Sequence, residues 1–151
     1  MPQSLAQIYL HIVFSTKERR PFLQDPIIRG RMHAYLHGIC ERQMFPSIAV
    51  GGVANHIHIA CRLGKTLDVA TFIKALKQGS SIWIKSEFQN QDSFHWQNGY
   101  GAFSVSPSHL RALKEYIQDQ EEHHRRESFQ DEFRRLLKIY EVEYDERYVW
   151  D

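Results

Sequence analysis

The order of its periodic segments is the feature that most constrains the fold of this 151-residue chain. Segments with strand character and segments with helical period follow one another as strand, helix, strand, strand, helix, strand. The expected strands cover residues 7–14, 45–51, 53–63 and part of 98–105, and the expected helices cover residues 26–42 and 66–88. This is the order of the ferredoxin-like, split β-α-β arrangement, an α+β fold with an antiparallel sheet. It predicts helices on one face of the sheet and an open opposite face.

Capping and turn residues mark the ends of several of these segments. Asp25 and Pro26 form an N-cap and first-turn pair at the start of the first expected helix. Gly51 and Gly52 separate two apolar runs, which favours an antiparallel hairpin with a glycine turn.

The C-terminal part of the chain is expected to add two helices to this core. Ser106 and Pro107 supply the N-cap and first turn of a third helix that runs to about His124. A fourth, amphipathic helix is expected from Ser128 to Tyr140, and an acidic, tyrosine-rich tail follows it.

Composition favours a single globular domain. With 42% hydrophobic residues the chain is expected to form one domain over residues 1–151, with a core of about 5–125 and a C-terminal helix and tail at 126–151. Two cysteines do not make a disulfide framework, and no apolar run reaches membrane-spanning length, so we expect a cytoplasmic protein without a membrane partner. Residues 1–65 carry 8 basic and 3 acidic side chains, whereas residues 109–151 carry 8 and 12. The basic N-terminal part is compatible with a polyanionic partner.

Two histidines, His56 and His58, stand two residues apart in the third expected strand. Residues at this spacing project to the same face of a sheet, while Ile57 and Ile59 would face the helices and the core. Both imidazoles are therefore expected on the open face, where neutral ring nitrogens can bind a metal ion. Two polar residues on an exposed sheet face are the alternative interpretation.

Tyr116 and Gln120 stand four residues apart and share one flank of the third expected helix. Transfer of a phosphodiester to a tyrosine requires charge neutralisation at the phosphate and a positioned nucleophile. A metal held by His56, His58 and Gln120 would act as the Lewis acid, and Tyr116 would be the catalytic nucleophile. The phosphotyrosine would retain the energy of the broken bond, so a free 3′-hydroxyl could reverse the step without ATP.

Three segments of the chain carry a family resemblance: His56-Ile57-His58, Trp96 to Val105, and Tyr116 to His124 with Phe129, Glu132 and Phe133 after it. In this order, and over most of the chain, they resemble the single-tyrosine HUH transposases. These are the small bacterial insertion-sequence transposases and the tyrosine transposases associated with palindromic repeats.

The resemblance implies a DNA transposase and endonuclease that cleaves and rejoins single-stranded DNA with hairpin ends. It implies a 5′-phosphotyrosine intermediate, a divalent cofactor, Mg²⁺ or Mn²⁺, and a ferredoxin-like sheet with added C-terminal helices that carry the catalytic tyrosine. It also implies a homodimer with active sites shared between subunits, in which the tyrosine of one subunit reaches the histidine pair of the other.

Basic and aromatic residues outside this set are expected to contact the DNA backbone and to stack on bases. They are Lys17, Arg19, Arg20, Lys74, Lys77, Trp96 and Tyr100. His123 and His124 diverge by about 100 degrees on a helix and are interpreted as residues of its C-terminal end, not as a ligand pair.

Two other classes of function remain open on the sequence. A noncatalytic or domesticated nucleic-acid-binding module fits the same element order, although the strand around His58 lacks the exposed aromatics of RNA-recognition domains. A small metal-dependent hydrolase with a water nucleophile would use the histidines but leaves Tyr116 without a role.

Overall fold

The computed structural model describes residues 2–151 and contains one antiparallel sheet with the strand order β2-β3-β1-β4. The strands are β1 (Tyr9–Ser15), β2 (Ser47–Val53), β3 (His56–Arg62) and β4 (Gly101–Val105). The helices are α1 (Pro26–Arg42), α2 (Val69–Glu87), α3 (Leu110–Gln118), α4 (Gln120–His123) and α5 (Phe129–Ile139). Short 3-10 turns cover Lys17–Arg19, Gln89–Gln91 and Pro107–His109. The predicted α+β, ferredoxin-like fold with added C-terminal helices is confirmed.

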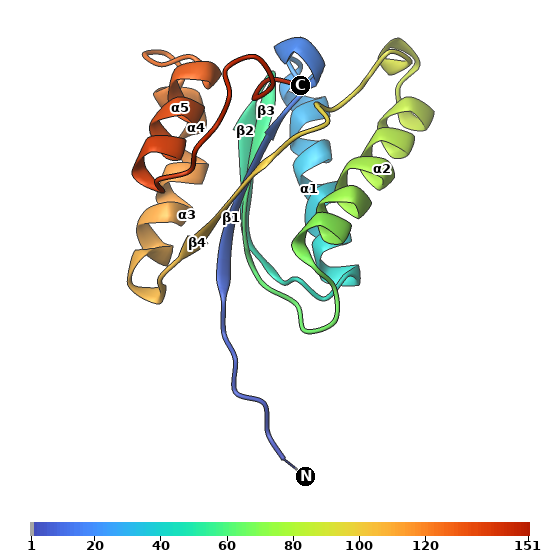
Figure 1. Cartoon of the computed structure of the whole chain (residues 1–151). Helices are drawn as coiled ribbons and strands as arrows, with labels where there is room; N and C mark the ends of the chain where they lie inside the picture. The colour runs from blue at the N-terminus through green and yellow to red at the C-terminus, as the bar shows by residue number, and fades with distance from the viewer. Residues whose placement is uncertain (1) are drawn as a thin grey trace.

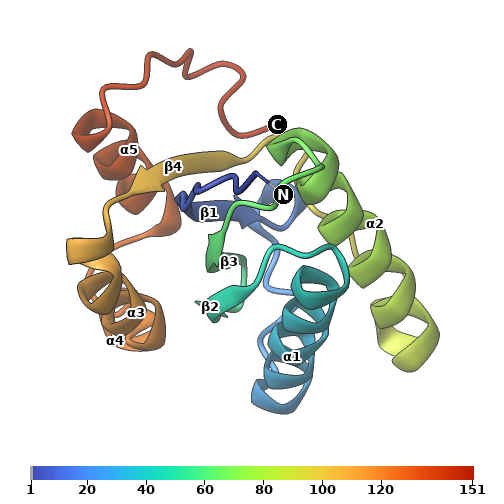
Figure 2. The same cartoon turned by 90° about the horizontal axis from the view of Figure 1, so that it is seen from below.

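Helices cover both faces of the sheet (Figures 1 and 2). The helices α1 and α2 lie on one side, and α3, α4 and α5 lie on the other. The prediction of an open second face was therefore wrong. The apolar stripes of the C-terminal helices need a surface to cover, and this face of the sheet provides it.

Each face of the sheet has its own apolar cluster. The larger cluster lies under α1 and α2 and includes Ile57 and Ile59, which face this side as predicted. The smaller cluster joins Val13 and Phe103 of the sheet to Phe133 and other apolar residues of α5. The second cluster fixes α5 against β1 and β4, and with it every polar side chain that α5 carries toward the sheet.

The turn of the β2–β3 hairpin lies at Ala54 and Asn55, so the predicted glycine turn was wrong. Gly51 lies inside β2, where α3 approaches the strand closely. A Cβ atom at Gly51 would lie 2.5 Å from the backbone oxygen of Ile117. The glycine therefore permits a close helix-to-strand contact.

The predicted third helix is interrupted. It begins with a 3-10 turn and stops at Asp119, whose φ of −97° and ψ of 20° leave the helical region before α4 begins. The helix predicted over residues 128–140 forms as α5. Its N-cap Ser128 accepts a 3.1 Å hydrogen bond from the amide of Asp131.

The tail after α5 contains no helix or strand within the described residues, and it returns across the β4 side of the sheet (Figure 2). Arg19 donates a 2.6 Å hydrogen bond to the backbone oxygen of Trp150. The amide of Gly99 donates a 2.8 Å hydrogen bond to the backbone oxygen of Asp151. No helix within residues 2–151 combines the length and the apolar character that crossing a membrane requires.

Candidate active site

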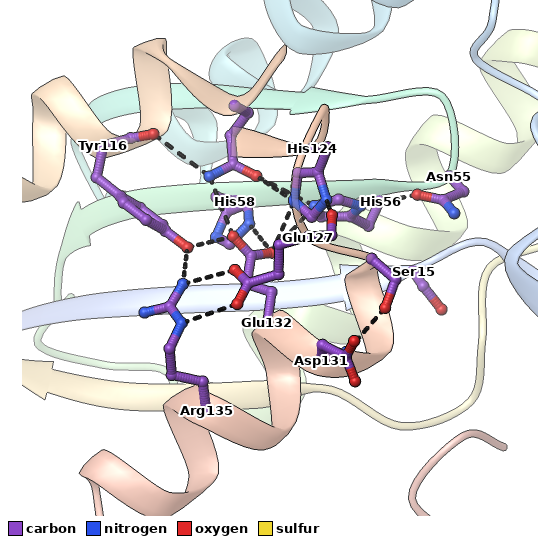
Figure 3. Close-up of polar contacts among 12 residues, drawn as sticks. Ser15, Asn55, His56, His58, Tyr116, His124, Glu127, Asp131, Glu132 and Arg135 are labelled. Atoms are coloured by element: carbon purple, nitrogen blue, oxygen red, sulfur yellow. Dashed lines mark hydrogen bonds and ion pairs between the residues drawn. The ribbon is translucent and has the colours of Figure 1, made fainter. Parts of the chain in front are cut away.

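The two histidines of β3 lie buried between the sheet and the C-terminal helices. His56 and His58 are both 0% exposed, and their rings contact Gln120 of α4 and Glu132 of α5 (Figure 3). The Nδ1 atom of His56 lies 2.8 Å from Oδ1 of Asn55, and that of His58 lies 2.8 Å from Nε2 of His11 on β1. Both rings are thus held by their Nδ1 atoms, and their Nε2 atoms point to a common centre.

Glu132 of α5 occupies this centre (Figure 3). Its Oε1 atom lies 3.2 Å from Nε2 of His56, 3.0 Å from that of His58 and 3.1 Å from that of His124. Glu132 is 0% exposed. The side chains come from β3, from the end of α4 and from α5, so only the folded chain assembles them.

Gln120 faces the same centre from the first residue of α4. Its Oε1 atom lies 3.1 Å from Nε2 of His56 and 3.1 Å from Nε2 of His124. Its amide nitrogen donates to Oε2 of Glu132 and to the backbone oxygen of Tyr116, each at 3.3 Å. The amide oxygen is therefore directed at the histidines.

Tyr116 reaches the cluster through its hydroxyl group. The hydroxyl donates a hydrogen bond to Oε2 of Glu132 and accepts one of 2.9 Å from Nη2 of Arg135. Burial and the neighbouring Glu132 carboxylate raise the pKa of Tyr116 well above its usual value, although Arg135 opposes the shift. The phenol is consequently protonated at neutral pH and has a defined proton acceptor.

The charges of the cluster are set by its burial. Burial lowers the pKa of His56 to about 4 and that of His11 to about 3. Burial alone would raise the pKa of Glu132, but hydrogen bonds to His124, His56 and His58 outweigh it and hold the pKa well below its usual value. Burial lowers the pKa of His124, but the hydrogen bonds and negative charges of Glu132 and Glu127 together outweigh it, so the pKa is raised. The cluster is thus a carboxylate held ionised beside the neutral imidazole of His56.

The donor set fits a divalent metal ion. His56, His58, His124 and Glu132 offer ligand atoms that all lie within 4.8 Å of one another. Neutral imidazoles are ligands of first-row transition metals, and carboxylate and amide oxygens also suit Mn²⁺ and Mg²⁺. Three imidazoles favour Mn²⁺, Co²⁺ or Zn²⁺ over Mg²⁺, which prefers oxygen ligands.

The structure brings four predicted site residues together within one chain: His56, His58, Tyr116 and Gln120. His124 lies at the C-terminal cap of α4, as predicted, and His123 is not part of the cluster. The structure adds that the His124 ring faces His56, with centroids 4.5 Å apart, and belongs to the donor group. Glu132 and Arg135 were not predicted to be site residues. A usable signal for Glu132 was a carboxylate between two phenylalanines on the apolar stripe of an amphipathic helix.

Four of the expected DNA contacts line a hollow of about 620 Å³ between α2 and the segment before β4: Lys74, Lys77, Trp96 and Tyr100. Lys74 and Tyr100 remain open to it, and Tyr100 is 41% exposed. Base stacking by Trp96 does not fit the structure, because its ring is 4% exposed and its Nε1 donates to Ser80 Oγ at 2.9 Å.

Lys77 also has a structural task in place of the expected phosphate contact. Its ammonium group donates to the backbone oxygens of Gln97, Asn98 and Gly99 at 2.8, 3.0 and 2.7 Å. Burial lowers its pKa to about 8. All three N–H donors of the ammonium group hold the segment that leads into β4.

The remaining expected DNA contacts lie around the turn after β1. Lys17 and Arg20 border a second hollow, of about 320 Å³, and Arg20 pairs with Glu18 at 3.1 Å. Arg19 is engaged by the tail through its hydrogen bond to the Trp150 backbone and by stacking over the Trp150 ring at 5.8 Å.

Comparisons with known proteins identify one family by sequence and a shared fold by structure. The sequence pattern of the family described as "Transposase IS200 like" matches residues 4–120. A solved structure from Deinococcus radiodurans R1, provisionally assigned as a transposase, has 23% identity and a TM-score of 0.64, covering 80% of this chain and 95% of its own. The structure of a REP-associated tyrosine transposase bound to a REP hairpin has 13% identity and a TM-score of 0.59, covering 82% of this chain and 73% of its own. No curated protein matches the chain.

Proposed function

The chain belongs to the family of IS200-like transposases, and from this premise we propose that it cleaves and rejoins single-stranded DNA with Tyr116 as the nucleophile. The observation that carries the proposal is the junction at Glu132, which receives the Tyr116 hydroxyl on one oxygen and meets three histidines with the other. A nucleophile with a proton acceptor and an adjacent cluster of metal-binding donors is what phosphodiester transfer requires.

In the proposed reaction the Tyr116 hydroxyl gives its proton to Glu132, and its oxygen attacks the phosphorus. The bond from phosphorus to the 3′-oxygen breaks, and that oxygen takes up a proton. The products are a DNA fragment joined to the protein by a 5′-phosphotyrosine and a second fragment that ends in a free 3′-hydroxyl. The reverse reaction with a second 3′-hydroxyl rejoins DNA without ATP, because one phosphodiester has been exchanged for another.

His56, His58 and Gln120 are proposed as metal ligands, as the family resemblance implies, and the geometry adds His124 and Glu132 to the donors around the same centre. A divalent cation bound there, Mn²⁺ or Mg²⁺, would supply Lewis acidity at a non-bridging phosphate oxygen. Asn55 and His11 would orient the two ligand rings of β3 through their Nδ1 atoms.

For the DNA we propose single strands with hairpin ends, since one solved neighbour in fold is bound to a REP hairpin. Lys17, Arg20, Lys74 and Tyr100 keep side chains open to the hollows that they line and are the proposed backbone and base contacts. The homodimer with shared sites stays a prediction of the family resemblance.

The test is a covalent adduct assay with single-stranded hairpin DNA and Mn²⁺. DNA labelled at its 3′ end should yield labelled protein, and DNA labelled at its 5′ end should yield a shortened strand with a 3′-hydroxyl. The adduct should disappear in Tyr116→Phe and persist in Tyr148→Phe, a matched control because Tyr148 is 63% exposed. Cleavage without an adduct would instead support a metal hydrolase, and binding without cleavage would support a noncatalytic DNA-binding module.

A further inference from the structure

We propose that Arg135 is a further catalytic residue, which stabilises the Tyr116 oxygen as it attacks and as it leaves. The inference rests on the proposed function. Arg135 lies on α5, three residues after Glu132, and its Nη2 atom donates to the Tyr116 hydroxyl at 2.9 Å. Its guanidinium carbon lies 5.8 Å from the centre of the Tyr116 ring. The attacking oxygen therefore sits between a carboxylate that accepts its proton and a cation that faces its lone pairs (Figure 3).

A second carboxylate fixes the orientation of the guanidinium group. Nε of Arg135 donates to Oε2 of Glu127 at 3.1 Å, and Nη2 donates to Oε1 at 2.9 Å. This two-point contact holds the planar group without occupying Nη1, which makes no hydrogen bond within residues 2–151. The Arg135 side chain is 41% exposed, and Nη1 is the guanidinium nitrogen left to bind a phosphate that approaches Tyr116.

This geometry matches the movement of charge in the reaction. When the Tyr116 proton passes to Glu132, the phenolic oxygen gains negative charge, and the N–H group of Arg135 already points at it. When the oxygen bonds to phosphorus, the charge spreads over the phosphate oxygens, which Nη1 can contact. In the reverse step the phenolic oxygen is the leaving group, and the same donor stabilises it. Arg135 itself keeps its proton throughout, since its hydrogen bonds to Glu127 raise its pKa further above its already high usual value.

The competing explanation is that Arg135 only fastens α5 to α3. If Arg135 only fastened α5, Arg135→Ala would lower the stability of the protein, and a small added cation would not restore the reaction rate. A catalytic role predicts that free guanidinium ion, placed in the space left by Arg135→Ala, restores part of the rate. Chemical rescue therefore separates the two explanations.

The experiment measures single-turnover formation of the Tyr116 adduct on 3′-labelled hairpin DNA with Mn²⁺. Arg135→Ala should slow it by about 10²- to 10³-fold, the usual effect of removing one donor at a developing oxyanion. Guanidinium chloride below denaturing concentration should restore part of the rate, whereas sodium chloride at equal ionic strength should not. Mn²⁺ affinity should be unchanged, because Arg135 contacts none of the histidines.

Two further variants complete the test. Arg135→Lys keeps the charge but lacks the planar fork, and it should react more slowly than the wild type even if the alanine variant does not fold. Arg134→Ala is the matched control, since Arg134 is the adjacent arginine of α5 and pairs with Asp131 and Glu146 instead. An undiminished rate in Arg135→Ala or Arg135→Lys, or an alanine variant that guanidinium does not accelerate, overturns the role of Arg135 alone. A wild-type protein without any adduct overturns the proposed function together with it.

Discussion

Glu132 accepts the hydrogen bond of the Tyr116 hydroxyl through one carboxylate oxygen and meets the histidine cluster through the other. One buried side chain of α5 therefore joins the candidate nucleophile on α3 to the candidate metal ligands on β3. The family match covers residues 4–120, so the contacts that place Glu132 at the centre of the site come from the structure.

We expect Glu132→Gln to slow adduct formation by about 10²- to 10⁴-fold, the range for loss of a general base. The amide is a poor acceptor for the Tyr116 proton and carries no charge toward the histidines. Single-turnover labelling of the protein by 3′-labelled DNA measures the effect. Glu122→Gln is the control, because Glu122 is exposed and pairs with Arg125, away from the cluster. A wild-type rate in Glu132→Gln would exclude Glu132 as the proton acceptor.

We expect His11→Ala to weaken Mn²⁺ binding by about 10- to 100-fold, as loss of an orienting partner of a ligand commonly does. His11 lies 2.8 Å from Nδ1 of His58 and stacks on its ring, with centroids 5.1 Å apart. Isothermal titration calorimetry measures the affinity without DNA. His37→Ala on the exposed side of α1 should bind as the wild type does. Equal affinities for the two variants would show that His58 needs no partner on β1.

The metal-free protein should lose stability as the pH falls from about 6.5 to about 4. Burial lowers the folded-state pKa of His11 to about 3 and that of His56 to about 4, so in this window the unfolded chain binds more protons. The free energy of unfolding then falls on acidification, by at most about 1.4 kcal/mol per pH unit for each histidine. His124 does not oppose this loss of stability. Its pKa is raised in the folded state, so below its unfolded-state pKa it is protonated in the folded and in the unfolded chain.

Urea unfolding at several pH values measures the slope. His11→Phe should reduce the dependence of the unfolding free energy on pH by the contribution of one histidine, since one buried neutral imidazole is gone. A free energy of unfolding that stays constant or rises on acidification would contradict the assigned protonation states.

We expect Gly51→Ala to cost about 1–3 kcal/mol of stability and to lower the rate of adduct formation. The added methyl group would meet the backbone oxygen of Ile117 at 2.5 Å and its Cγ2 at 2.8 Å, so α3 must shift, and Tyr116 is the neighbouring residue. Gly30→Ala on α1 is the matched control, because nothing lies within 4 Å of its added Cβ and the exchange should slightly stabilise the helix. Thermal unfolding and the adduct assay together measure both effects, and equal behaviour of the two variants would argue against close packing at Gly51.

Most of the fold could be predicted from the sequence, because strand and helix periods and helix caps are local properties. The helix from Pro26 to Arg42 has the predicted bounds, and the strand order follows from the ferredoxin-like connection pattern. The hairpin turn could not be placed correctly. Gly51 and Gly52 have the chemistry of a turn, yet Gly51 serves a contact with α3 that the local sequence does not reveal.

The sequence by itself determined which chemistry the chain offers: the paired His56 and His58 on one side of a strand, and Tyr116 and Gln120 one helical turn apart. Only the tertiary structure decided which groups these residues meet. A periodic pattern shows that α5 must bury one stripe, but not which face of the sheet receives it or which polar side chain it carries inward. Packing of that stripe against β1 and β4 placed Glu132 among the histidines and Arg135 beside Tyr116, because contacts between distant segments depend on the whole packed core.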